Sequence, residues 1–334
     1  MRASDLEVYR DARTGSRFEL RIDEQTDREI VSGRLVAGDV SFEIVDGIPR
    51  FCPPENYAAS FGYQWHRFAT TQLDSHSDSS RSSEQRLFNE TRWPRDLRGK
   101  RVLEAGSGAG RFTELLASTG AELFSFDYST AVEVNRDNCR KFDNVSFAQA
   151  DILAPPYEPG AFDMVLCLGV LQHTPDPRGA FRALVRLVKP GGEIVVDVYR
   201  LWWRCLFKGK YYLRPVTRLL PARAQHFVVR AHLAWAYPLT GLAHRLGGRG
   251  VGRRASALLS VADFRGAGGI SAARARELSE LDTLDMLAPR YDKPQTLRTV
   301  RSWLEEAGLE GIEVGPGYNG IEARGRVPLS AQVG

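Results

Sequence analysis

The chain has 334 residues, of which 43% are hydrophobic and 26% charged, and its formal net charge is +4. This length suits one large α/β domain with additions or two modest domains, and the composition permits an enzyme without identifying one. Four scattered cysteines without a CxxC pair argue against an iron–sulfur site, a zinc ribbon with its ligands or a disulfide framework. The mixed, charged start and the lack of an apolar run of about 20 residues predict a cytoplasmic protein without a membrane span.

The N-terminal 55 residues contain several short β-like stretches and are predicted to form a small β-rich segment. Residues 57–68 have the pattern of a helix that leads into the following domain. The polar stretch 74–86 is rich in Ser, Asp and Arg and predicts a mobile connection.

From residue 101 onward, short apolar runs alternate with amphipathic stretches, which is typical of βαβ units and a mostly parallel sheet. An amphipathic helix near residue 297 and two short strands, split by a Gly-Pro-Gly turn, complete seven strands with a terminal hairpin. The expected strands are 101–105, 122–126, 145–150, 162–168, 193–198, 311–314 and 320–323; the expected helices are 111–118, 129–141 and one that begins at 177 after the cap residue Asp176.

Residues 200–290 interrupt this alternation and are too long and too aromatic for a plain loop. We therefore expect a helical insertion in one domain made of residues 56–199 and 291–334. Between Val198 and Ala262 there are twelve Lys and Arg residues and no Asp or Glu. Such segregation predicts an anionic ligand or surface, and the alternative is a helical cap whose arginines face water.

The run Val102 to Arg111 places an acid, Glu104, in a strand and three glycines in the turn that follows. Glycines at this point let a ligand approach the backbone closely. The spacing is GxGxG rather than the GxGxxG of dinucleotide sites. Because Glu104 would repel a diphosphate, the turn favours a ligand with a cationic part.

Acids also close the next two strands. Asp127 lies 23 residues after Glu104 in the sequence and closes the second strand. Asp151 closes the third strand, with Ile152 next to it. The carboxyl ends of parallel strands meet at one edge of a sheet, so the three acids are predicted to face one crevice. Each acid taken alone has an ordinary alternative, which is to cap the helix that follows it.

These motifs resemble the class I S-adenosylmethionine-dependent methyltransferase family, especially its members with a methyltransferase type 11 domain. Further matching pieces are Phe162 to Thr174 and Leu187 to Gly192. The resemblance implies a Rossmann-like seven-stranded sheet, S-adenosylmethionine as cofactor with S-adenosylhomocysteine as its product, and no metal. The implied cofactor-binding residues are Glu104, Gly106, Ser107, Gly108, Gly110, Asp127, Tyr128, Asp151, Ile152 and Leu168, together with Tyr63 and Gln64 from the helix before the core.

Residues 31–51 resemble the small zinc ribbon that precedes some methyltransferases, including its Asp-Gly-Ile-Pro signature at Asp46 to Pro49. Val36, Ala37 and Asp39 stand near the positions of the cysteines. A β scaffold without a metal site is therefore predicted.

His173 lies just after the fourth strand, at the mouth of the same crevice, where an imidazole suits a general base. The alternative is that His173 forms a hydrogen bond with a loop and shapes the pocket. The helical insertion is expected to act as a lid that selects the acceptor, with Tyr199, Arg214 and Arg218 as acceptor contacts.

The acceptor is predicted to be a small molecule methylated on oxygen, nitrogen or carbon: a secondary metabolite, a sugar, or an anionic or lipid-linked intermediate. Peripheral membrane contact is compatible with the basic insertion, and nucleic acid is not expected because the patch lacks an RNA-binding signature. Two other functions stay open, a catalytically silent S-adenosylmethionine-binding partner protein and a nicotinamide-dependent oxidoreductase.

Overall fold

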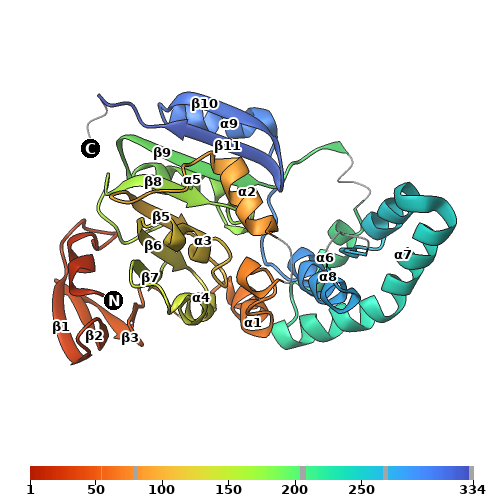
Figure 1. Cartoon of the computed structure of the whole chain (residues 1–334), viewed down its shortest axis with the longest axis horizontal. Coiled ribbons are helices and arrows are strands. Elements are labelled where there is room, and N and C mark those ends of the chain that lie inside the picture. The colour runs from red at the N-terminus through yellow and green to blue at the C-terminus, as the bar shows by residue number, and fades with distance from the viewer. Residues whose placement is uncertain (54, 78–80, 204–207, 266–269, 331–334) are drawn as a thin grey trace. The chain divides into compact units, whose positions relative to one another are not determined.

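A seven-stranded sheet forms the centre of the larger part of the molecule, with strand order β10-β11-β9-β8-β5-β6-β7 (Figure 1). The five strands β5 to β9 run parallel, and β11 is antiparallel to both of its neighbours, β9 and β10. The sequence-based fold prediction is confirmed. The strands are β5 (Arg101–Ala105), β6 (Glu122–Asp127), β7 (Val145–Gln149), β8 (Phe162–Cys167), β9 (Val188–Val198), β10 (Glu310–Gly317) and β11 (Gly320–Arg326).

Helices cover both faces of this sheet, because neighbouring residues of each buried strand point to opposite sides. Val102 belongs to the apolar cluster with the helices on one face, and Leu103 belongs to the cluster on the other. The first face carries α2 (Ser82–Thr91), α3 (Thr113–Ser118) and α4 (Ala131–Cys139); the second carries α5 (Pro177–Val185) and α9 (Leu297–Glu306).

The helix starts follow local chemistry. Asp176 caps α5 by accepting a hydrogen bond from the Gly179 N–H at 3.0 Å, and Pro177 occupies the first turn, as predicted. Two predictions were wrong. Helix α2 begins at Ser82, inside the stretch expected to be a mobile connection, and β9 begins at Val188 rather than at Glu193.

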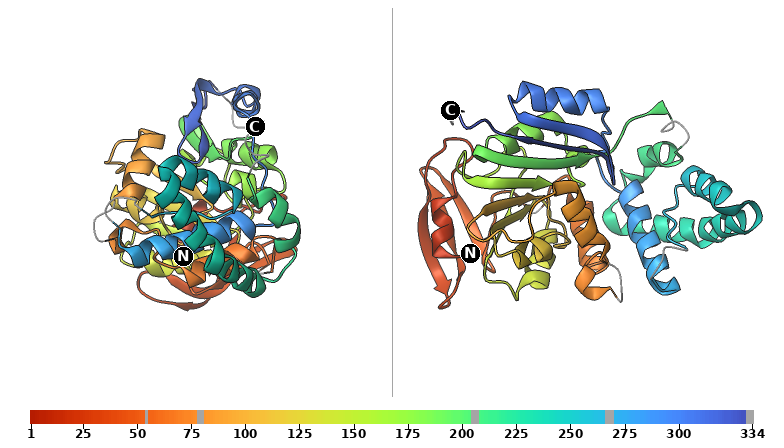
Figure 2. Two further views of the ribbon diagram at one scale, coloured as in Figure 1. Left: turned by 90° about the vertical axis from the view of Figure 1, so that its right-hand side faces the viewer. Right: turned by 45° about the horizontal axis from the view of Figure 1, so that its top comes forward.

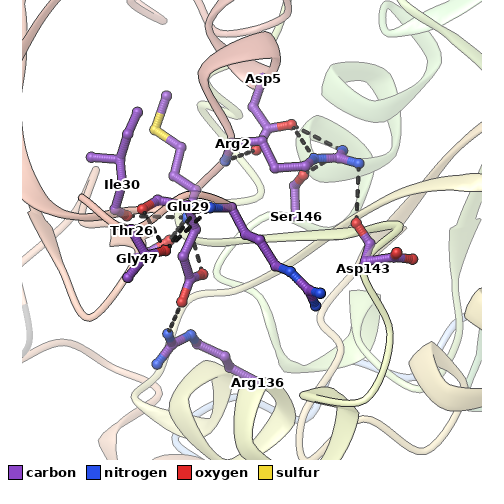
Figure 3. Close-up of polar contacts among 11 residues, drawn as sticks. Arg2, Asp5, Thr26, Glu29, Ile30, Gly47, Arg136, Asp143 and Ser146 are labelled. Carbon is purple, nitrogen blue, oxygen red and sulfur yellow. Dashed lines mark hydrogen bonds and ion pairs between the residues drawn. The ribbon is translucent and has the colours of Figure 1, made fainter.

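The N-terminal segment is an antiparallel four-stranded sheet with order β1-β2-β3-β4, preceded by the short helix η1 (Ala3–Glu7). Its chain meets the edge strand β7, where the Phe51 N–H donates to the Gln149 carbonyl at 2.8 Å. Figure 3 shows two side-chain links to the core: Arg2 Nη2 donates to Ser146 Oγ at 2.8 Å, and Arg136 Nη2 donates to Glu29 at 2.9 Å. The strands are β1 (Glu19–Gln25), β2 (Ile30–Ala37), β3 (Val40–Val45) and β4 (Ile48–Pro49).

The insertion is helical. It consists of α6 (Lys210–Thr217), α7 (Ala222–Leu258) and α8 (Ala272–Leu287), whose ribbons are green to blue in Figure 2. Helix α7 is kinked at Gly248. Helix α1 (Ala59–Arg67) and the residues after it pack with these helices through an apolar cluster that includes Phe68, Val229, Leu233, Leu281 and Leu284.

These statements come from a computed structural model that describes residues 1–53, 55–77, 81–203, 208–265 and 270–330; Arg204 and Phe207 of the basic stretch lie outside them. Contacts divide the chain into two units. The first, the sheet unit, comprises Met1–Asn56, Ser83–Arg200 and Tyr291–Gly334, and the second, the helical unit, comprises Tyr57–Ser82 and Leu201–Arg290. Residues 57–82 thus cluster with the insertion, whereas the sequence-based division assigned them to the core. Within the described ranges, no helix is both long and apolar enough to cross a membrane.

Candidate active site

The turn after β5 requires its glycines. Gly106 has φ +74° and Gly110 has φ +95°, in the left-handed region that side chains disfavour. A Cβ on Gly106 would collide with the Val170 side chain, and one on Gly110 would collide with the carboxamide of Asn135. The turn therefore folds tightly at the carboxyl edge of the sheet.

Glu104 lies beneath this turn with a buried carboxylate. Its Oε2 accepts hydrogen bonds from Thr113 Oγ1 at 2.5 Å and Ser125 Oγ at 3.0 Å. Burial raises the pKa of the Glu104 carboxyl to about 7, against the opposite effect of those two bonds, and the negative charge of Asp127 raises it further. Among the described residues, no cation pairs with Glu104, and its Oε1 has no protein donor.

Asp127 joins the end of β6 to the glycine turn. Its Oδ2 accepts from the Gly108 N–H at 2.9 Å, and its Oδ1 accepts from the N–H and the hydroxyl of Ser129 at 2.8 and 2.7 Å. Burial raises the pKa of Asp127, while these hydrogen bonds act to lower it. A carboxylate has about four acceptor positions, so the protein already uses most of them.

Asp151 and Ile152 follow β7 at the same edge. Asp151 Oδ1 accepts from the Leu153 N–H at 2.9 Å, and burial raises the pKa of this carboxyl. Ile152 is buried. Tyr128 follows Asp127, and its carbonyl accepts from Asn56 Nδ2 at 2.8 Å and Gln149 Nε2 at 3.1 Å.

Ser107 provides an unsatisfied polar atom in the turn. Its hydroxyl is buried and has no hydrogen-bond partner among the residues that the structure describes. Buried polar groups are normally satisfied, so an orphaned hydroxyl between two of the required glycines fits a ligand that supplies the partner.

A buried ionic network that the sequence-based prediction missed holds the loop after β8. Asp197, at the end of β9, accepts from the Gly169 N–H and pairs with Arg86 of α2. Arg86 also donates to Glu90 at 2.7 Å. Gly169 directly follows Leu168, so Asp197 fixes the backbone at the predicted rim of the cofactor site. Burial raises the pKa of Glu90 to about 7.

His173 and Tyr199 lie together in the sheet unit, with ring centroids 5.4 Å apart and an edge-to-face angle of 86°. The His173 Nδ1 lies 3.0 Å from the carbonyl oxygen of Tyr291. A carbonyl only accepts, so Nδ1 carries the proton of the neutral ring and the acceptor lone pair is on Nε2.

The other predicted site residues belong to the helical unit. Tyr63 bonds His226 at 2.8 Å, and Gln64 Nε2 donates to Asp285 at 3.4 Å; their contact with a cofactor stays a prediction. Arg214 is buried, and its guanidinium donates to the carbonyls of Met286 and Pro289 at 2.9 and 2.8 Å. Those bonds hold the fold of the helical unit, and the acceptor contact of Arg214 stays a prediction.

Arg218 is exposed, and its acceptor contact stays a prediction. No cluster of three or more His, Cys, Asp or Glu suited to a metal is present within the described part of the chain.

Comparison with known proteins finds a family model that matches part of the chain. Residues 103–196 match the family model described as a methyltransferase domain. The ubiquinone biosynthesis O-methyltransferase of Alkalilimnicola ehrlichii is 41% identical over 103 residues, which cover 30% of this chain and 41% of that protein. The enzyme of the same name from Pectobacterium carotovorum is 30% identical over 147 residues, covering 40% of this chain and 62% of that protein.

The chain thus spans about half the length of these curated relatives. Among solved structures, magnesium protoporphyrin IX methyltransferase from Synechocystis PCC 6803 is 15% identical, with a TM-score of 0.44 and coverage of 81% of this chain and 95% of that one. The glycine turn and the strand-end acids Glu104, Asp127 and Asp151 all lie within residues 103–196, the part of the chain that matches the methyltransferase domain model.

Proposed function

We propose that this chain is an S-adenosylmethionine-dependent methyltransferase that methylates a small-molecule acceptor. The observation that carries the proposal is the buried pair Glu104 and Asp127. Both carboxyls have raised pKa values, and neither has a cationic partner among the described residues. Buried charges are costly without a counter-charge, so the site favours a cationic ligand over the diphosphate of a nicotinamide cofactor.

The acids and their neighbours at the carboxyl edge of the sheet have separate roles in this proposal. Glu104 Oε1 binds the ammonium of the methionine part, and the Ser107 hydroxyl donates a hydrogen bond to the carboxylate of that same part. Asp127 binds the ribose. Asp151 and Ile152 hold the adenine, and Leu168 forms the rim next to the methyl group. When bound, S-adenosylmethionine supplies an electrophilic methyl group on a sulfonium sulfur.

The residues at the mouth of the site position the acceptor and remove its proton. In the transfer the S–CH₃ bond breaks, the acceptor–CH₃ bond forms, and the electron pair of the broken bond stays on sulfur. His173 Nε2 accepts the proton that the acceptor loses, while the Tyr291 carbonyl holds the imidazole in the required tautomer. Tyr199, whose ring meets His173 edge to face, contacts the acceptor.

Methylation of oxygen is the form that the curated relatives favour, since their names describe O-methyltransferases. The acceptor itself is a metabolite, a sugar or a lipid-linked intermediate. The helical unit acts in this proposal as the lid that selects it.

Calorimetry with S-adenosylhomocysteine and with NADH tests the proposal. We expect S-adenosylhomocysteine to bind with a dissociation constant in the micromolar range, about −8 kcal/mol, and NADH to give no saturable heat. Saturable binding of NADH without binding of S-adenosylhomocysteine would contradict the methyltransferase proposal and favour an oxidoreductase.

A catalytically silent protein would bind S-adenosylhomocysteine but transfer no methyl group. Transfer from methyl-labelled S-adenosylmethionine to a panel of hydroxylated acceptors separates the two. With an active acceptor, His173→Ala should lower turnover about a hundred-fold while S-adenosylhomocysteine affinity stays unchanged. A loss below about five-fold would return His173 to a purely structural role.

A further inference from the structure

The helical unit contains its own cavity, of 590 Å³, lined by residues of α7 and α8. This volume is typical of small-molecule sites, which span roughly 300 to 1,000 Å³. Its α7 wall is formed by Arg223, Phe227, Arg230 and Tyr237, and Arg276 comes from α8. The α7 residues are spaced three, four or seven apart, so they share one face of the helix.

The three arginines of this cavity, Arg223, Arg230 and Arg276, make no hydrogen bond or ion pair with any described residue. Other arginines of the same unit are engaged: Arg265 donates to the Tyr237 carbonyl at 2.9 Å, and Arg274 donates to the Thr71 carbonyl at 2.5 Å. Three unpaired guanidinium groups around one cavity repel one another. An anion inside the cavity would relieve that repulsion.

Among the lining residues, three guanidinium groups stand against one carboxylate, Glu280, which forms its hydrogen bond with another residue. Glu280 Oε1 lies 2.6 Å from His226 Nε2, and Tyr63 Oη lies 2.8 Å from His226 Nδ1. The neutral imidazole satisfies both contacts when Tyr63 donates to Nδ1 and the Nε2–H donates to Glu280. The Tyr63–His226–Glu280 chain is therefore closed on itself, and the cavity keeps an excess of positive charge.

The rest of the lining is apolar. Phe227 stands at the rim with 74% of its surface exposed, and Leu233, Ala234 and Tyr237 continue the wall along α7. Arg223 and Arg230 are two helical turns apart, and Phe227 lies between them on the same face. Leu233, Ala234 and Tyr237 follow one to two turns beyond Arg230, so the lining combines guanidinium groups with apolar side chains.

We propose that this cavity binds an organic phosphate monoester with an apolar body, whose phosphate is held by Arg223, Arg230 and Arg276. A phosphate monoester carries a charge between −1.5 and −2 near pH 7 and offers three acceptor oxygens, which matches a set of guanidinium groups better than a single carboxylate does. The ligand is either a soluble phosphate ester or the monoester headgroup of a lipid. The proposal concerns the helical unit alone and does not rest on methyl transfer.

Octyl phosphate below its micellar concentration is the probe. Calorimetry on the full chain should give saturable binding at one site, and the double variant Arg230→Gln/Arg276→Gln should weaken it at least ten-fold. The matched control is Arg253→Gln/Arg254→Gln, which removes the same charge from exposed arginines of α7 outside the cavity. It should bind octyl phosphate like the unmodified chain.

Phe227→Ser should weaken the binding of octyl phosphate several-fold, because the apolar body of this ligand contacts the ring. The affinity for inorganic phosphate, which has no apolar body, should stay unchanged. Absence of saturable binding, or equal weakening in the control pair, overturns the proposal. S-adenosylhomocysteine affinity, measured on every variant, should stay constant. If the unmodified chain does not bind S-adenosylhomocysteine, that result counts against the methyltransferase proposal instead. Failure of the one proposal is therefore distinguishable from failure of the other.

Two further arms identify the source of the phosphate. Phosphatidylcholine vesicles containing phosphatidic acid test the lipid headgroup, and farnesyl phosphate in solution tests a soluble ester. Sedimentation with vesicles that is lost in Arg230→Gln/Arg276→Gln assigns a lipid, whereas binding of a soluble ester without vesicle sedimentation assigns a metabolite. If neither class binds, the proposal is wrong.

Discussion

At the scale of single residues, Asp127 has two tasks, since it orders the glycine turn and is proposed to bind the ribose. Asp127→Ala should raise the dissociation constant of S-adenosylhomocysteine ten- to a hundred-fold, about 1.5 to 3 kcal/mol, because ligand hydroxyls lose a charged acceptor. It should also lower the melting temperature, since the donors of Gly108 and Ser129 lose their partner. Ser129→Ala keeps the carboxylate and should change affinity much less. Unchanged affinity in Asp127→Ala, measured by calorimetry, would refute the ribose assignment.

Glu104 should couple ligand binding to protons. Its pKa near 7 in the free protein is raised above the value of about 4.3 for an unfolded chain, so the folded state holds a proton over that interval. A ligand ammonium favours the charged form and lowers the pKa. Binding of S-adenosylhomocysteine near pH 6 should therefore release up to one proton, and affinity should fall as the pH drops from 7 to 5.

Calorimetry in buffers with different ionisation enthalpies measures this proton release. Glu104→Gln should abolish it, whereas Glu122→Gln, which removes a carboxyl paired with Arg101 on the same sheet, should not. The same raised pKa predicts that Glu104 lowers the free energy of unfolding as the pH rises from about 4.3 to 7. Proton release that persists in Glu104→Gln would place the titrating group elsewhere.

Residue type and position predicted where the acids of the candidate site lie but not which groups the arginines contact. Glu104, Asp127 and Asp151 follow from the strand pattern, because the ends of parallel strands share one edge. Arg86 and Arg214 do not follow, since a buried arginine has the same sequence signature as an exposed one. Their partners, Asp197 and the carbonyls after α8, are distant in sequence and become neighbours only in the folded chain.

At the scale of elements, the glycine turn offers a matched pair of substitutions. Gly99 and Gly110 both have positive φ, but a Cβ on Gly99 meets nothing within 4 Å, whereas one on Gly110 meets the carboxamide of Asn135. Gly99→Ala should cost about 1 to 2 kcal/mol of unfolding free energy from backbone strain alone. Gly110→Ala should cost clearly more, as denaturant melts would show.

Gly110→Ala should also weaken S-adenosylhomocysteine binding. Asn135 donates to Ser125, and Ser125 donates to Glu104, so displacing the carboxamide disturbs the buried acid. If Gly99→Ala and Gly110→Ala lowered the free energy of unfolding equally, the backbone of the turn would have shifted to accommodate the Cβ without moving Asn135.

The strands were predicted to within a residue or two where apolar runs are bounded by turns, as for β5 and β6. Helix α2 was missed because its exposed side is rich in polar residues while its buried side includes Arg86 and Glu90, which pair with each other. Periodicity counts apolar residues, so a helix that buries an ion pair gives a weak signal.

At the scale of the whole molecule, the chain is divided into a sheet unit and a helical unit, and the proposed lid role of the second unit can be measured. If α7 and α8 close over the ligand, S-adenosylhomocysteine should slow amide hydrogen exchange in the helical unit as well as in the glycine turn. Asp127→Ala serves as the control, since it should lose both effects at the same ligand concentration. Protection confined to the sheet unit would end the lid proposal.

The pairing of Phe51 with Gln149 has a consequence for solubility. An exposed edge strand is a template for pairing with another chain, and β7 ends the sheet on that side. The N-terminal segment lies along this edge and is attached to it. It therefore also protects β7 from pairing with a strand of another chain. Removing residues 1–51 would leave the domain with its glycine turn and acids but with an open β7, which makes aggregation the expected fate of such a truncated chain.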